Sequence, residues 1–287
     1  MRIALCETIK GTNDFICDLL KKSEDNITTI NNDDFALGAR HIRELLKGAD
    51  TVINLMGEKF LKKNYSIRQK EEIYYSRVEN TKILVNAING MKNPPSLLIM
   101  TTLVNIYDNI NIHDEYSNNF GDDFLSDMCK NWEKSAFKLN NINTRICIFR
   151  TGIVLSDKGG LLPKVKKLSK YNFDFKIGNG KQSVPFVHVN DVLKVIKWCI
   201  KNSTAKGIYN LVAPEILTNE SFSNHLKKSY RKLRMFYYPK FYLKFIFRDE
   251  LLFFTTCQFV LPHRLLSEGY EFDFPTLESC LEQRTKN

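Results

Sequence analysis

The chain lacks several features that would place it in a specialised class. No apolar run in its 287 residues approaches the ~20 residues that a membrane-spanning helix needs. A strand-like run begins at once, so the charged and apolar regions of a signal peptide and the pattern of a transit peptide are missing. We therefore expect a cytoplasmic globular protein.

Patterns for metal binding and for disulfides are also missing. No two cysteines form C-x-x-C, and their number, seven, is odd, which favours free buried thiols. No cluster has the spacing of metal ligands, so we predict no metal site. No Ser–His–Asp or Cys–His arrangement is recognisable either. The cysteines are Cys6, Cys17, Cys129, Cys147, Cys199, Cys257 and Cys280.

The formal charge is strongly positive, +10 at neutral pH. A basic surface attracts anions such as nucleotides, nucleic acids and acidic lipids. The lysines are spread along the chain, however, and there is no zinc finger, RNA-binding aromatic signature or basic helix. We expect no nucleic-acid partner and, if the protein is active, a small-molecule substrate.

Short apolar runs alternate with amphipathic segments along most of the sequence. This alternation is typical of βαβ units and a parallel sheet. The predicted fold class is α/β, a Rossmann-type doubly wound parallel sheet with a small C-terminal substrate lobe. Strands are expected at 2–6, 26–30, 51–56, 96–101, 144–155 and 207–213. Helices are expected at 13–22, 36–48, 66–90, 123–139, 218–232 and 276–283. One more helix is expected to begin at Asp191, which is a candidate cap.

The alternation stops in two stretches, which suggests two domains. Residues 1–155 and about 186–215 are expected to form the Rossmann-type dinucleotide-binding domain. Residues about 156–185 and 216–287 are expected to form the small substrate lobe. Ligands of such folds sit at the carboxyl ends of the strands, so we expect the lobe over that edge.

Seven stretches in a fixed order carry a family resemblance. They resemble the epimerase/dehydratase branch of the short-chain dehydrogenase/reductases, and within it the atypical group described as nucleoside-diphosphate-sugar epimerases with a distinctive C-terminal domain. The resemblance implies NADP or NAD as cofactor and a nucleotide-sugar-like or other small polar substrate. The stretches are GADTVINLMGE (48–58), SRVENTKILVNAI (76–88), GDDFLSDMCKNWEKSA (121–136), RTGIVLSDKGGLLPK (150–164), GNGKQSVPFVHVNDV (178–192), GIYNLVAPEILTNESF (207–222) and FVLPHRLLSEGYEFDFPTLE (259–278).

The resemblance also implies cofactor contacts at the ends of two strands. Gly57 lets the backbone approach the ribose and phosphates, and Asn54 offers a polar contact. Met56 stands where the family usually has a small residue. Thr102 matches the Ser or Thr that bonds the substrate in active relatives.

The catalytic pair of the wider superfamily has no counterpart here. A tyrosine, with a lysine four residues later, moves the proton during hydride transfer. The matching positions in this chain are Leu125 and Cys129. Tyr107 is a candidate substitute for the catalytic tyrosine. The alternative is that its ring packs at the base of the loop and has no catalytic role.

Polar residues in the matched stretches are candidates for lining the substrate cleft. For Arg77 we leave open an anionic ligand group or a surface ion pair, and for His188 an acid–base or a structural role. The candidates are Glu58, Arg77, Thr81, Arg150, Lys164, Lys181 and His188.

The phosphate-binding loop departs most from the family, whose first strand is followed by G-G-T-G-F-I-G. An alignment without gaps places Glu7, Lys10 and Asn13 at the three glycine positions; a shifted alignment keeps only Gly11. Side chains there occupy the space of the pyrophosphate. After the second strand, Asn31 and Asn32 supply no charge for a 2′-phosphate. We therefore predict that NADP or NAD binds weakly or not at all.

A late segment, 234–254, is rich in aromatic and basic residues. A helix of the lobe is one interpretation, and a membrane-surface helix is the other. Two functions remain open: a nicotinamide-dependent oxidoreductase or epimerase, and a non-catalytic relative that serves as a binding or scaffolding module.

Overall fold

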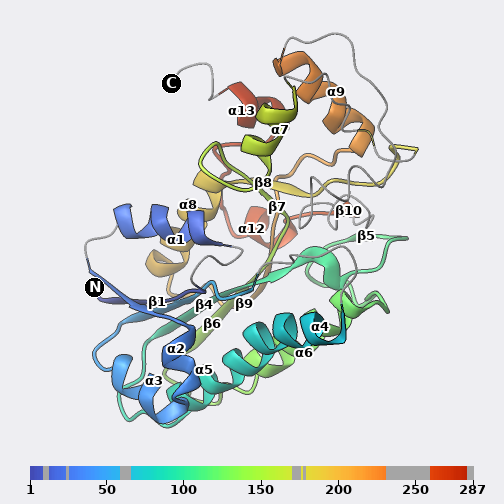
Figure 1. Ribbon diagram of the computed structural model, residues 1–287. Helices are drawn as coiled ribbons and strands as arrows, with labels where there is room; N and C mark the ends of the chain where they lie inside the picture. The colour runs from blue at the N-terminus through green and yellow to red at the C-terminus, as the bar shows by residue number, and fades with distance from the viewer. Residues whose placement is uncertain are drawn as a thin grey trace.

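The computed structural model describes residues 1–8, 13–23, 26–58, 66–169, 176, 179–230 and 259–282. At its centre lies a six-stranded parallel sheet with the order β2-β1-β3-β4-β6-β9, which confirms the predicted fold class (Figure 1). The strand order reverses between β1 and β3, and this switch point is where doubly wound folds bind ligands. The strands are β1 (Ile3–Cys6), β2 (Ile27–Ile30), β3 (Thr51–Asn54), β4 (Leu97–Leu103), β6 (Arg145–Thr151) and β9 (Gly207–Leu211).

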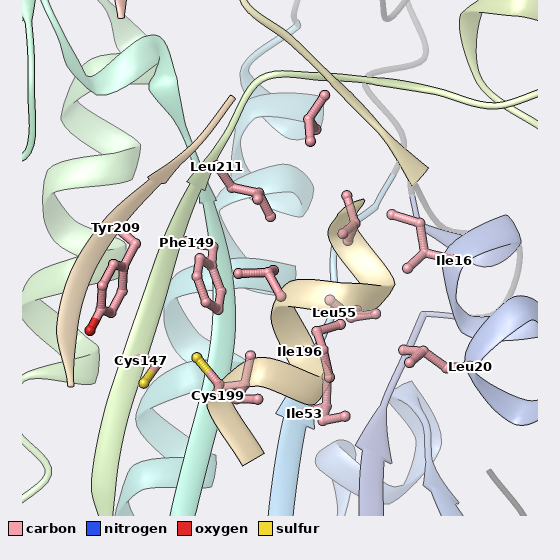
Figure 2. Close-up of a cluster of buried hydrophobic side chains, with 14 of the residues drawn as sticks. Ile16, Leu20, Ile53, Leu55, Cys147, Phe149, Ile196, Cys199, Tyr209 and Leu211 are labelled. Carbon is pink, nitrogen blue, oxygen red and sulfur yellow. The ribbon is translucent and has the colours of Figure 1, made fainter. Parts of the chain in front are cut away.

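Helices cover both faces of the sheet, which explains why nearly every side chain of β1, β3 and β4 is buried. On one face α1 (Asp14–Ser23) and α8 (Val189–Lys201) pack on the central strands. Figure 2 shows part of this core, with side chains from both helices and from β3, β6 and β9. The helices of the other face are α2 (Asn32–Ala36), α3 (Ala39–Leu45), α4 (Ile67–Tyr74), α5 (Asn80–Asn89) and α6 (Phe124–Ala136).

The helix expected at 66–90 is interrupted once. Ser66 caps α4, and a π-helical turn, η1 (Tyr75–Glu79), connects α4 to α5. Inside this turn Ser76 and Arg77 are buried and bond to the loop that follows β3. The π-turn therefore adapts the helix to that loop, as π-bulges often do at functional sites.

The strand expected at 144–155 is two strands. Gly152 separates β6 from β7 (Ile153–Leu155), which pairs with β8 (Phe186–His188) in a separate sheet. A Cβ atom at Gly152 would lie 2.7 Å from the carbonyl oxygen of Pro185. Only glycine fits this close approach, so the change of partner strand occurs there.

A second hydrophobic cluster forms the core of the lobe. It joins β7 and β8 to α7 (Leu161–Ser169), α9 (Asn219–Tyr230) and α13 (Leu277–Glu282). Ile153, Leu155 and Phe186 pack here, so β7 and β8 lie at the border of the two expected domains. The domain division stays a prediction. The remaining elements are η2 (Val104–Ile106), β5 (Ile112–His113), β10 (Phe259–Val260) and α12 (His263–Ser267).

The caps of the later helices are partly as expected. Thr218 accepts a hydrogen bond from the Ser221 amide at the start of α9. Helix α8, in contrast, is capped by His188, whose Nδ1 accepts from the Asn190 amide. Asp191 lies inside the helix and does not cap it. Its carboxylate accepts hydrogen bonds from the backbone amides of residues 273 and 274, which are distant in sequence.

Among the helices that the structure describes, none has the length and apolar character to cross a bilayer. The segment 234–254 lies outside the described residues, so both interpretations of it stay predictions.

Candidate functional site

A row of polar side chains crosses the sheet near the carboxyl ends of three strands. Thr102 of β4 is the register partner of Arg150 of β6, which is the partner of Asn210 of β9. All three residues are at most 3% exposed. The row lies where short-chain dehydrogenases place their reacting groups, so its hydrogen bonds decide what chemistry the edge can perform.

A buried ion pair forms the centre of this row. Nη2 and Nε of Arg150 donate to the two carboxylate oxygens of Glu133 on α6, at 2.7 and 2.8 Å. Thr102 Oγ1 donates to the same carboxylate at 3.0 Å. The two charged side chains are 3% and 7% exposed. Such a bidentate, desolvated pair fixes both partners in one geometry.

Tyr107 completes the network on the side of η2. Its hydroxyl accepts from Nη1 of Arg150 at 2.7 Å and bonds Asn210 Oδ1 and the Asp114 carbonyl, each at 2.9 Å. Its ring stacks on His113 with centroids 4.6 Å apart. Burial raises the pKa of Tyr107 to about 12, although Arg150 opposes the shift. A catalytic tyrosine needs the opposite shift, so this environment is that of a structural hydroxyl.

The helix face that carries the catalytic pair in the wider superfamily is apolar here. Leu125 and Cys129 are 3% and 0% exposed and pack among the hydrophobic side chains under β4. Burial raises the pKa of the Cys129 thiol to about 12. One turn further along this face stands Glu133. The carboxylate that binds Arg150 thus occupies the end of the former catalytic face.

The switch point between β1 and β3 is bridged by neutral side chains. The Gly57 amide donates to Thr8 Oγ1, and Asn13 Nδ2 donates to the Leu55 carbonyl, both at 3.0 Å. These backbone groups lie where a dinucleotide would contact the loop after β3. Beside them, the Glu7 carboxylate accepts from Lys21 Nζ at 2.5 Å.

Met56 and Asn54 support this loop from below. Met56 is 1% exposed and packs into the cluster under β1 and β3, away from the strand ends. Asn54 Oδ1 accepts from the Met56 amide at 3.1 Å. The bulky residue at a usually small position is therefore accommodated in the core. Gly11 and Lys10 lie outside the described residues.

The predicted cleft residues of η1 and α5 are buried beneath the same loop. Arg77 is 3% exposed, and its Nη2 donates to the Glu58 carbonyl at 3.0 Å. It is therefore not a surface ion pair. Thr81 Oγ1 accepts from Trp132 Nε1 at 2.9 Å, which ties α5 to α6. The Glu58 carboxylate accepts from Asn32 Nδ2 at 3.1 Å.

The candidate residues of the lobe stand on separate elements. Lys164 is half-buried on α7, and Lys181 is exposed in the loop before β8. His188, at the end of β8, is 6% exposed, and desolvation lowers its pKa to about 4. Its Nδ1 is used as the helix cap, and its ring lies 3.9 Å from that of Phe274. This environment supports the structural role.

Sequence reasoning missed two members of the buried network, Glu133 and Asn210. One signal was present, since Glu133 follows Leu125 and Cys129 at helical spacing on an apolar face. A carboxylate on such a face needs a buried cation as partner. Within the described residues, no group of His, Cys, Asp and Glu could hold a metal ion.

The parallel sheet, its switch point and the polar row at the strand ends are those of a Rossmann-type dehydrogenase-like protein. A family model described as a domain of unknown function, DUF1731, matches residues 238–283. An epimerase family protein of Staphylococcus aureus is 28% identical over 280 residues, which cover 93% of each protein.

Solved structures agree with this similarity. The human epimerase family protein SDR39U1 (isoform 2), crystallised with NADPH, superposes with a TM-score of 0.85, 25% identity and 99% coverage of both chains. A nucleoside-diphosphate sugar epimerase of Corynebacterium glutamicum gives a TM-score of 0.74 at 20% identity, over 98% of this chain and 57% of that one. The chain is similar over most of its length to epimerase family proteins and shares their Rossmann-type fold.

Proposed function

We propose that this protein is a non-catalytic member of its family, a binding module that retains the Rossmann-type fold and takes up nicotinamide dinucleotides only weakly. The observation that carries the proposal is the buried network of Thr102, Glu133, Arg150 and Tyr107. It fills the place where relatives of the superfamily hold their acid–base groups.

Proton transfer to a substrate needs a reachable group with a suitable pKa. Thr102 and Tyr107 are 0% and 1% exposed, and each hydroxyl is engaged within the network. The raised pKa of Tyr107 disfavours the phenolate that would accept a proton. Leu125 and Cys129 add no acid or base with an ordinary pKa. These properties support a binding function over hydride transfer.

Dinucleotide affinity is expected to be low for two reasons. Glu7, Lys10 and Asn13 replace the loop glycines, and Glu7 adds negative charge beside the pyrophosphate position. The contacts of Thr8 and Asn13 with the loop after β3 must also be broken or displaced. Together these effects should weaken binding about tenfold to a thousandfold, at ~1.4 kcal/mol for each decade.

NADPH should gain nothing over NADH. The 2′-phosphate of NADPH would lie beyond β2, where dinucleotide-binding proteins often place an arginine. Here Asn31 caps α2, and Asp33 and Asp34 follow in its first turn. Negative side chains at that position oppose a phosphate.

Calorimetric titration with NADPH and NADH tests the proposal. The triple variant E7G/K10G/N13G restores the glycines and should bind more tightly than the natural protein. The matched variant E7Q removes only the negative charge of residue 7. It therefore separates charge repulsion of the pyrophosphate from the steric effect of the side chain. A dissociation constant near ~1 μM for the natural protein would contradict the proposal and favour the alternative, an active nicotinamide-dependent oxidoreductase or epimerase. The human relative crystallised with NADPH supports that alternative.

A further inference from the structure

Two cysteine side chains lie close together in the main hydrophobic core. Neither belongs to the polar row at the strand ends. Cys147 lies on β6 and Cys199 on the last turn of α8, and both are 0% exposed. The side chains of Cys147 and Cys199 interact with each other. Figure 2 shows the two sulfur atoms between the strand and the helix.

A guanidinium group lies beside this pair. Nη1 of Arg145 donates to Cys147 Sγ at 3.7 Å and to the Ala205 carbonyl at 2.8 Å, and Nη2 donates to the Cys199 carbonyl at 2.6 Å. Within the described residues, the ion pairs do not include Arg145, so no carboxylate there neutralises it. Its positive charge can therefore stabilise a thiolate at Cys147.

The other buried cysteines have a different environment. Desolvation raises the pKa of Cys6, Cys17, Cys129 and Cys280. The pKa of Cys147 is instead lowered, first by the hydrogen bond from the Cys199 thiol and then by Arg145. The pKa of Cys199 is raised by the same contact. The Arg145 guanidinium therefore favours a thiolate at Cys147, beside the Cys199 thiol.

We propose that Cys147 and Cys199 form an oxidisable dithiol site, in which hydrogen peroxide converts the two thiols to a disulfide that links β6 to α8. The Cys147 thiolate attacks a peroxide oxygen, the O–O bond breaks, and a sulfenic acid and one water form. The Cys199 thiol then loses its proton and attacks the Cys147 sulfur; the S–O bond breaks and the second water leaves. Two thiols are oxidised, and one hydrogen peroxide is reduced to two waters.

The position of Cys199 gives a small oxidant a route to the pair. Helix α8 ends at Lys201, and Asn202 is its C-cap residue. Terminal helical turns open locally at a lower free energy than the whole fold. The Cys147 thiol also donates to the Ala205 carbonyl, in the turn just after this helix. Opening of this end removes the Ala205 carbonyl from Cys147 and the last helical turn from Cys199.

Treatment of the reduced, native protein with hydrogen peroxide tests the site. We expect the intact mass to fall by two hydrogen atoms, and a peptide map after alkylation to show Cys147 joined to Cys199. The oxidised protein should unfold at a higher temperature, because the bridge restricts the unfolded chain. The variant C199A should accumulate a sulfenic acid on Cys147 that a 1,3-dione probe captures, and C147A should form neither product.

The matched control is C17A, which removes another buried thiol of the same cluster. It should form the Cys147–Cys199 bridge at the natural rate. If native protein forms no such bridge while other thiols oxidise, the proposal is wrong. It is also wrong if the bridge forms only in denaturant, or if Cys199 reacts at an unchanged rate in C147A. The peptide map of the natural protein decides the question even if a variant fails to fold.

Discussion

Two groups of polar side chains lie at the carboxyl edge of the same sheet, and they are held in different ways. At β4 and β6, opposite charges are buried, and Glu133, Arg150 and Tyr107 each contact two other members of the group. At β1 and β3, neutral side chains make one bond each to the backbone: Thr8 to the Gly57 amide and Asn13 to the Leu55 carbonyl.

The difference shows which end of this edge is fixed more firmly. A buried ion pair with shared hydrogen bonds resists the loss of any single member, because each removal leaves a charge or a polar atom unpaired. Replacing a neutral bond to the backbone with a bond to a ligand leaves no buried charge unpaired, so it costs less than breaking the ion pair, although it still lowers the affinity for the ligand. The end near Thr102 and Arg150 is therefore committed to structure, while the switch point retains replaceable contacts.

The largest expected effect comes from breaking the buried ion pair. Glu133→Gln leaves the Arg150 guanidinium buried without its counter-charge, which should destabilise the fold by about 3–5 kcal/mol. Urea unfolding of the two proteins measures the difference. As a control, Glu72→Gln removes the partner of Arg68 in an exposed pair and should change stability by at most about 1 kcal/mol. Equal effects of the two substitutions would contradict the structural role of the network.

The next effect concerns the hydroxyl at the side of the same network. Tyr107→Phe leaves an Arg150 N–H and Asn210 Oδ1 without this partner, which should cost about 1–3 kcal/mol. The exposed Tyr75 provides the matched control, and Tyr75→Phe should stay within about 0.5 kcal/mol of the natural protein. Chemical denaturation followed by circular dichroism gives both values. A Tyr107→Phe protein of natural stability would show that the hydroxyl is dispensable.

At the switch point the effect should be smaller. Asn13→Ala removes one neutral hydrogen bond to the Leu55 carbonyl, and we expect a loss of about 0.5–1.5 kcal/mol. The exposed Asn131 on α6 also bonds a backbone carbonyl, so Asn131→Ala measures the same deletion outside the crevice. If Asn13→Ala costs as much as Glu133→Gln, the two ends of the edge do not differ as described.

Much of the fold could be predicted because it depends on local patterns. The runs around β1 and β3 are rich in apolar residues, which is typical of strands buried on both faces, and every residue of the two strands is buried. The division at Gly152 could not be predicted, since it depends on the Pro185 carbonyl, which approaches from another part of the chain. The sequence also favoured Asp191, not His188, as the cap of α8. The Asp191 carboxylate instead accepts hydrogen bonds from the amides of residues 273 and 274, a long-range contact that no local pattern reveals.

Three members of the buried network could be chosen from the sequence, but the environment of their side chains could not be predicted. Thr102, Tyr107 and Arg150 were all chosen from the sequence, and the structure brings them into one network. The sequence placed them beside a ligand because charged and hydroxyl groups at strand ends usually serve one. Their burial follows from Glu133, whose pairing with Arg150 requires α6 to pack across β4 and β6. No local pattern reports such a contact.

The smallest effect is expected at Asp108, in the exposed loop that leads from Tyr107 to β5. Hydrogen bonds from the Ile110 amide, then from Asn111, hold the pKa of this carboxyl at about 2. A lowered folded-state pKa means that the carboxylate stabilises the fold above its unfolded pKa, and that this contribution is lost as the pH falls from about 4 to about 2.

Asp108→Asn should therefore reduce stability at neutral pH, by less than about 1 kcal/mol because the carboxyl group is partly accessible to solvent, which screens its charge. The difference from the natural protein should vanish near the lower limit of that range, where the natural side chain is itself neutral. Urea unfolding at a series of pH values measures both proteins. A difference that persists unchanged in acid would mean that Asp108 acts through its shape rather than its charge.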